Sequence, residues 1–164
     1  MKFLVVLFLV ISIGYGDANS DFDKGIKALI SKDKKQAFYY LNKASKDNHI
    51  EASYNLALMY YMGDGVDQNI SMSAKLLESS ADAGYKKSID NVGRVYMQLL
   101  KFDKAIKWLK INAKNGDIQA NYLLSEIYIE KGNFKDAKIN AKKAIDNGNL
   151  DAQNLWNTYN LSKY

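Results

Sequence analysis

Few residues in this 164-residue chain have the type and spacing needed for covalent chemistry. Ser31 and Lys34 have the Ser-x-x-Lys spacing of a serine nucleophile and its base, but the Ser-Asp-Asn and Lys-Thr-Gly elements of that mechanism are absent. The chain has no Cys, which excludes a thiol nucleophile, disulfides and thiolate metal sites, and His49 is its only His. We therefore predict no catalytic residue, no metal site and no cofactor, and we interpret His49 as a solvated turn residue.

One pattern fits a covalent modification. Asn69 and Ser71 form an Asn-x-Ser glycosylation acceptor, and Asp67 precedes the Asn by two residues, as in the longer bacterial form of this acceptor. The pattern falls on an expected turn between two helices, where a glycan could be attached. An Asn at this place also fits a helix N-cap, which is the structural alternative.

The charge of the chain is mildly basic. Lys and Arg number 23 and Asp and Glu number 18, which gives a formal net charge of +5. This balance favours acidic partners at low salt. The Lys residues are interleaved with Asp and Glu along the whole sequence, so we predict no nucleic-acid partner.

The first twenty residues have the three-part pattern of a secretory signal peptide. Lys2 supplies a positive charge, an apolar run follows over 3–13, and small residues allow cleavage after Gly16 or after Ser20, of which we prefer Ser20. The apolar run is too short for a membrane-spanning helix, which needs about 20 residues. We therefore predict a signal peptide over 1–20, no membrane span after its removal, and a mature chain in the bacterial periplasm or secreted.

The rest of the sequence is an internal repeat, and small residues mark it. One column of the repeat has spacings of 32, 36, 32 and 32, and it consists of Ser20, Ala52, Ser88, Ala120 and Ala152. A second small column consists of Gly25, Ala57, Gly93 and Ser125, and the units end near Asn48, Gly84, Gly116 and Gly148. Small residues at fixed positions let two helices approach closely, and Gly or Asn at a unit end fits a left-handed helix C-cap. The pattern predicts one helical hairpin per unit, and such units must stack to bury their apolar faces.

The second unit has Ala52, Leu56-Ala57 and Tyr60, followed by the turn Gly63-Asp64-Gly65-Val66. These residues resemble the Sel1-like repeat, a relative of the tetratricopeptide repeat, and that turn marks the Sel1-like family. The later turns, such as the one over 101–105, are more similar to tetratricopeptide turns. The resemblance implies an all-α, right-handed α-solenoid over 21–164. We expect four hairpin units and a C-terminal capping helix, with boundaries at 20–50, 51–86, 87–118, 119–150 and 151–164.

The resemblance also implies a function, because most solenoids of this kind bind proteins or peptides on a concave face lined by the first helix of each hairpin. The residues we expect to bind a partner there are Tyr54, Asn55, Tyr61, Lys87, Asn91, Arg94, Tyr122 and Glu126. We thus predict an exported, non-catalytic scaffold for a protein or peptide ligand, with a cell-wall component as a further candidate. The alternative is a β-lactamase or penicillin-binding hydrolase, as some secreted Sel1-like proteins have been named.

Overall fold

The structure, a computed structural model, describes residues 17–164, and all regular secondary structure within them is helical. The bulk of the expected signal peptide, residues 1–16, lies outside the described residues. The helices of the first two hairpins are α1 (Ala18–Ile30), α2 (Lys34–Lys46), α3 (Ile50–Met62) and α4 (Ile70–Asp82). Those that follow are α5 (Lys86–Gln98), α6 (Phe102–Lys114), α7 (Ile118–Glu130), α8 (Phe134–Asp146), α9 (Leu150–Thr158) and the 3-10 helix η1 (Leu161–Lys163).

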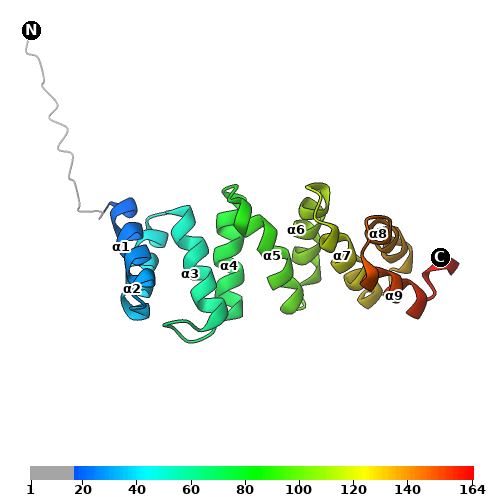
Figure 1. The fold of residues 1–164 in the computed structure, drawn as a ribbon, viewed down its shortest axis with the longest axis horizontal. Helices are drawn as coiled ribbons and strands as arrows, with labels where there is room; N and C mark the ends of the chain where they lie inside the picture. The colour runs from blue at the N-terminus through cyan, green and yellow to red at the C-terminus, as the bar shows by residue number, and fades with distance from the viewer. Residues whose placement is uncertain (1–16) are drawn as a thin grey trace, which may run out of the picture.

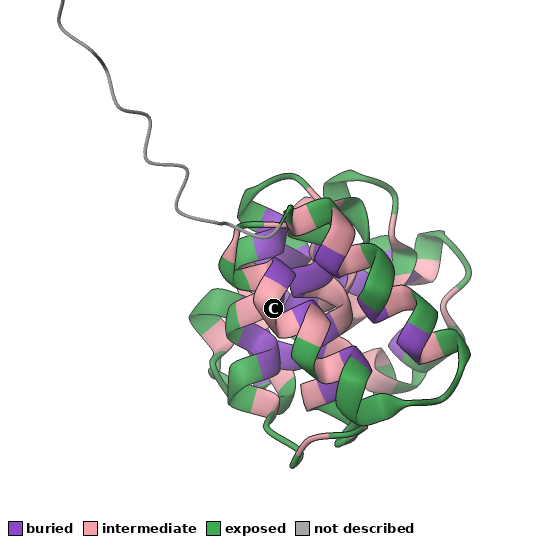
Figure 2. Cartoon of the chain, turned by 90° about the vertical axis from the view of Figure 1, so that its left-hand side faces the viewer, coloured by how far each residue is buried: buried purple, intermediate pink, exposed green. Residues whose placement is uncertain are grey.

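The helices form a solenoid in which each helix packs against the next one along the chain. Figure 1 shows them side by side in chain order, with α1 and the C-terminus at opposite ends of the stack. Seen along the stack, buried residues gather between the helices and exposed residues cover the outside (Figure 2). The predicted all-α solenoid of helical hairpins is therefore confirmed.

The last helix closes the stack, as predicted. Leu155 and Trp156 of α9 pack against the main apolar core, whereas Asn154 and Asn157 are exposed. Leu161, just beyond α9, is completely buried and contributes to the same core. The chain thus covers the final hairpin with one amphipathic helix rather than with another full unit.

The unit ends adopt the backbone conformation that their residue types predict. Asn48, Gly84, Gly116 and Gly148 all have positive φ, from 63° to 91°. Asn and Gly tolerate this left-handed region best, and each such residue ends a second helix and turns the chain into the next unit. The turns inside the hairpins use the same conformation at Lys32, Leu100 and Gly132, and the first two of these residues were not expected there.

The turn between α3 and α4 is longer than the others and contains two glycines, one of which lies close to α2. Gly63 and Gly65 both have positive φ, and a Cβ on Gly65 would lie 2.7 Å from the carbonyl oxygen of Lys34. The Lys34 amino group also forms a salt bridge with Asp64. The Gly-Asp-Gly turn is thereby held against the start of α2, which connects the second hairpin to the first.

The first helix begins at Ala18, and its first turn is well anchored. Asp17 caps it, with Oδ1 accepting a hydrogen bond from the Asn19 amide at 3.1 Å. Asp21 is buried and pairs with the amino group of Lys43 on α2 at 2.7 Å. The hydrogen bond from Lys43 holds the pKa of the Asp21 carboxyl below its ordinary value, although burial opposes this shift. The pairing joins α1 to α2 through a buried carboxylate.

A pair of substitutions separates the effect of the close approach at Gly65 on stability from the effect of backbone strain. Gly84 also has positive φ, but a Cβ there would meet nothing within 4 Å. We expect Gly84→Ala to lower the free energy of unfolding by about 1 kcal/mol through backbone strain alone. We expect Gly65→Ala to lower it by about 3 kcal/mol, because strain and a backbone clash act together. Urea unfolding followed by circular dichroism measures both, and equal losses would contradict the proposed contact with α2.

Candidate functional site

The residues expected to bind a partner lie on three first helices of the hairpins. We call the surface formed by the accessible side chains of α3, α5 and α7 the first-helix face. All eight predicted residues belong to it: Tyr54, Asn55 and Tyr61 on α3, Lys87, Asn91 and Arg94 on α5, and Tyr122 and Glu126 on α7. Tyr61 and Lys87 are exposed, and the other six are half-buried.

Asn55 and Asn91 occupy the same position on successive first helices, as the repeat predicts. Each donates a side-chain hydrogen bond to the carbonyl four residues earlier, Asn55 to Glu51 at 2.7 Å and Asn91 to Lys87 at 2.6 Å. These bonds orient both amides on the helix surface. Each side chain keeps an amide oxygen and a second N–H for a ligand.

Arg94 connects two repeats, a role that the sequence did not indicate. Its guanidinium donates to Asp117 Oδ2 at 2.7 Å and to the Asp90 carbonyl at 2.6 Å. The other oxygen of Asp117 accepts from the Ala120 amide and caps α7. Asp117 therefore joins the start of α7 to α5, and the fork of Arg94 is held in one orientation at the surface.

The tyrosines of the face are also fixed by neighbours. The Tyr122 hydroxyl donates to Glu126 Oε1 at 2.6 Å, and burial together with this hydrogen bond raises the pKa of Tyr122 to about 12. Tyr122 is therefore a neutral donor at physiological pH. The Tyr54 ring packs on the ring of Tyr85, the N-cap residue of α5, with centroids 5.3 Å apart. Part of each tyrosine thus stabilises the stack and part of it is accessible.

A cavity of about 450 Å³ opens on this face between α5 and α7. Its lining includes Arg94, Met97 and Gln98 from α5, and Gln119 and Leu123 from α7. The cavity places the hydrogen-bond donors of one arginine and two glutamines next to apolar side chains. Such a mixture suits a peptide that offers both backbone carbonyls and an apolar side chain.

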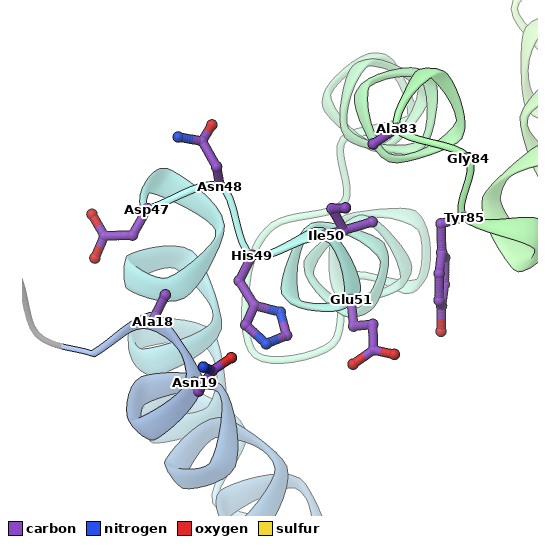
Figure 3. A pocket seen from close by; sticks show the side chains of 10 residues that line it. All are labelled: Ala18, Asn19, Asp47, Asn48, His49, Ile50, Glu51, Ala83, Gly84 and Tyr85. Carbon is purple, nitrogen blue, oxygen red and sulfur yellow. The ribbon is translucent and has the colours of Figure 1, made fainter.

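A second cavity, of about 500 Å³, is lined by the start of α1, the turn between α2 and α3, and the turn between α4 and α5 (Figure 3). His49 is in its wall, and the expectation that it is simply a solvated turn residue is wrong. His49 Nδ1 accepts a hydrogen bond from the Ala52 amide at 3.2 Å and so caps α3. Its ring stacks on Phe22 with centroids 4.2 Å apart. The imidazole therefore has a structural role at the junction between the first two units.

The Ser-x-x-Lys pattern does not form a catalytic pair. Ser31 ends α1, and its hydroxyl donates to the Ala28 carbonyl at 3.1 Å. Lys34 begins α2 and its amino group is bound to Asp64. A nucleophile needs its base within hydrogen-bond reach, and each of these groups has another partner.

Asn69, the expected glycosylation residue, is exposed at the start of α4. Its Oδ1 accepts from the Met72 amide at 2.9 Å, so the structural alternative of an N-cap is present. Glycosylation would take place on the side-chain nitrogen, which this cap does not use. Modification of Asn69 stays a prediction.

Within residues 17–164, no three His, Cys, Asp or Glu side chains come together in a way that could hold a metal ion. Over the same range, no helix combines the length and the apolar character that crossing a bilayer requires.

The family profile described as Sel1 repeat matches residues 22–49, 50–85 and 100–117, which together make up half of the chain. A putative sel1-like repeat-containing protein of Acanthamoeba polyphaga mimivirus is 27% identical over 127 residues. That alignment covers 76% of this chain but only 24% of the viral protein, so this chain spans about a quarter of its relative.

Solved structures with the same architecture include a protective antigen of uropathogenic Escherichia coli that displays an SLR fold. It has a TM-score of 0.63 and 25% identity, over 88% of this chain and 34% of the antigen. A Sel1 repeat protein from Oxalobacter formigenes has a TM-score of 0.57 and 21% identity, over 82% and 59% of the two chains. MamA from Desulfovibrio magneticus RS-1 has a TM-score of 0.60 and 18% identity, over 80% and 76%. The last two show likeness of fold alone.

Proposed function

Because this chain belongs to the Sel1 repeat family, we propose that it is an exported, non-catalytic scaffold that binds a protein or peptide through its first-helix face. The observation that supports this proposal most is the cavity between α5 and α7, whose lining includes Arg94, one of the residues expected to bind a partner. The solenoid fold supports an interaction role in general, and the first-helix face supplies a specific surface for it.

The first-helix face has the composition of a peptide-binding surface. Tyrosine and arginine are enriched where proteins bind each other, since they combine a large contact area with a polar group. Here Arg94 and Tyr122 are held in place by neighbours before a ligand arrives. A surface ordered in advance loses less conformational entropy on binding. An extended peptide along α3, α5 and α7 would meet Asn55 and Asn91 at equivalent positions, one repeat apart.

The hydrolase alternative finds no support in the geometry. The only Ser-x-x-Lys pair has its hydroxyl and its amine directed to other partners. A scaffold needs no such pair.

Four substitutions on the first-helix face test the proposal. We expect the variant Tyr54→Ala, Asn91→Ala, Arg94→Ala and Tyr122→Ala to lose at least about tenfold in capture of its partner, since it removes two aromatic anchors and two polar contacts. The measurement is crosslinking and pull-down from the exported fraction of cells that produce the chain, with each captured protein identified by mass spectrometry. Helical circular dichroism must stay unchanged.

The matched control places four alanines on second helices, outside the first-helix face, at Lys35, Lys46, Lys75 and Lys142, all exposed. If capture by the control falls as much as capture by the first-helix variant, or if neither falls, the binding face is misassigned. Hydrolysis of nitrocefin that is lost in Ser31→Ala would instead establish the enzyme alternative.

We also propose that the signal peptide is removed after Gly16 rather than after Ser20. Cleavage after Gly16 keeps Asp17, which caps α1, and the complete first turn that leads to buried Asp21. Cleavage after Ser20 would remove the cap and the first three residues of α1. A folded first hairpin therefore favours the earlier position.

The intact mass of protein purified from the periplasm or medium of an expressing bacterium tests this assignment. We expect a chain that begins at Asp17. A chain that begins at Asp21 would overturn the assignment of the cleavage position, and an uncleaved chain confined to the cytoplasm would overturn export itself.

A further inference from the structure

A third cavity, of about 600 Å³, lies on the other side of the solenoid, between the second helices α6 and α8. Its floor includes Leu124 and Tyr128 of α7, and its walls come from α6 and α8. We call it the α6–α8 groove. It shares no lining residue with the cavity on the first-helix face.

The preceding repeat provides an internal comparison for this groove. Helices α4, α6 and α8 have 13 residues each and begin at Ile70, Phe102 and Phe134, so residues 32 apart occupy the same position. The residues of the α6–α8 groove therefore have exact counterparts between α4 and α6. The side chains of the two places can therefore be compared position by position.

Between α4 and α6 the counterpart of the groove is filled and bridged. Trp108 is 3% exposed and is covered by the amino group of Lys107, 4.3 Å from its ring. Glu78 accepts hydrogen bonds from the Tyr96 hydroxyl and from the Lys104 amino group, both at 2.6 Å. Burial raises the pKa of Glu78, but these two bonds together with the positive charge of Lys104 hold the pKa below its ordinary value. This site is a closed network that joins three helices.

In the α6–α8 groove, the residues that close the earlier site are replaced. Asn140 stands where Trp108 stands one repeat earlier, and the smaller amide leaves the space open. Lys110 replaces Glu78, so Tyr128 has a lysine in place of the carboxylate that binds Tyr96. Ile139 replaces Lys107 and is 46% exposed at the edge of the groove.

The groove is also more positive than its counterpart, although Asp136 stands at the position of Lys104. Lys110 and Lys114 stand at the positions of Glu78 and Asp82, and Lys143 stands at that of Ile111. Within residues 17–164 none of these three lysines takes part in a salt bridge. Three ammonium groups at one opening, without carboxylate partners, attract an anionic ligand.

Asp136 and the apolar lining decide which kind of anion fits. Asp136 is part of the wall, and its carboxylate would repel a continuous polyanion such as nucleic acid or polyphosphate. A peptide can place carboxylates near the lysines and a backbone N–H near Asp136. Ile139 and Tyr128 offer contact to an apolar side chain between the acidic ones.

We propose that the α6–α8 groove is a second binding site, which takes an acidic peptide segment with apolar residues between its carboxylates. The site is independent of the first-helix face, so one molecule can hold two partners on opposite sides. Two replacements support this proposal. Asn140 at the position of Trp108 leaves the groove open, and Lys110 at the position of Glu78 reverses the charge there.

Fluorescence anisotropy with a fluorescein-labelled peptide Glu-Glu-Leu-Glu-Glu-Leu-Glu tests it on the mature chain. The variant Lys110→Glu with Lys114→Asp restores the residue types of the preceding repeat, and we expect it to weaken binding at least about tenfold. Asn140→Trp fills the groove without a change in charge, and we expect a similar loss. The control Lys35→Glu with Lys163→Glu makes the same change in net charge at exposed positions outside the groove, and we expect less than about a twofold effect.

Binding that is lost in both groove variants and retained in the control establishes the site. Failure of the wild-type chain to bind the peptide would overturn the proposal. Equal loss in the control would show general charge attraction and would also overturn it. If polyphosphate binds and the peptide does not, and Asn140→Trp abolishes that binding, the ligand of the groove is a polyanion and the peptide proposal is overturned. None of these outcomes bears on capture by the first-helix face, because the variants leave α3, α5 and α7 unchanged.

Discussion

The two helices of a hairpin approach each other at one column of small residues, and the rest of the solenoid depends on this contact. A Cβ on Gly25 would lie 2.8 Å from Leu41 Cγ, and one on Gly93 would lie 3.0 Å from Leu109 Cγ. In the fourth hairpin Ser125 takes the same place and donates to the Ala137 carbonyl at 2.9 Å while fully buried. Because each unit is only two helices thick, this separation sets where the next hairpin can stack and where its outer side chains point.

The two proposed binding surfaces follow from that geometry in different ways. The first-helix face repeats a position on successive helices, which places Asn55 and Asn91 in register and lets an extended ligand follow the stack. The α6–α8 groove arises where the repeat departs from itself, because Asn140 and Lys110 replace a buried tryptophan and a carboxylate. Regularity thus supplies the scaffold, and a local exception supplies a distinct pocket.

The sequence predicted most of the fold because its signals are local. Small residues, unit-end glycines and the Gly63-Asp64-Gly65 turn each act within one or two hairpins, so their spacing indicates helices, caps and stacking without further information. Positive φ at Lys32 and Leu100 was missed, since neither residue type signals that conformation. Arg94 bridging to Asp117 and His49 capping α3 were missed for another reason. Both depend on where a side chain points once the units are stacked, and the sequence pattern does not contain that orientation.

The close approach within a hairpin is tested most directly by adding volume at Gly93 and removing it from Leu109. We expect Gly93→Val to lower the free energy of unfolding by about 2–3 kcal/mol, as overpacking does in a tight interface. In the double variant with Leu109→Ala, the loss should be smaller than the sum of the two single losses by about 1 kcal/mol or more, because the added methyls occupy the vacated space. Urea unfolding of the four proteins measures this coupling. A Gly93→Val chain as stable as the original, or losses that simply add, would contradict the account.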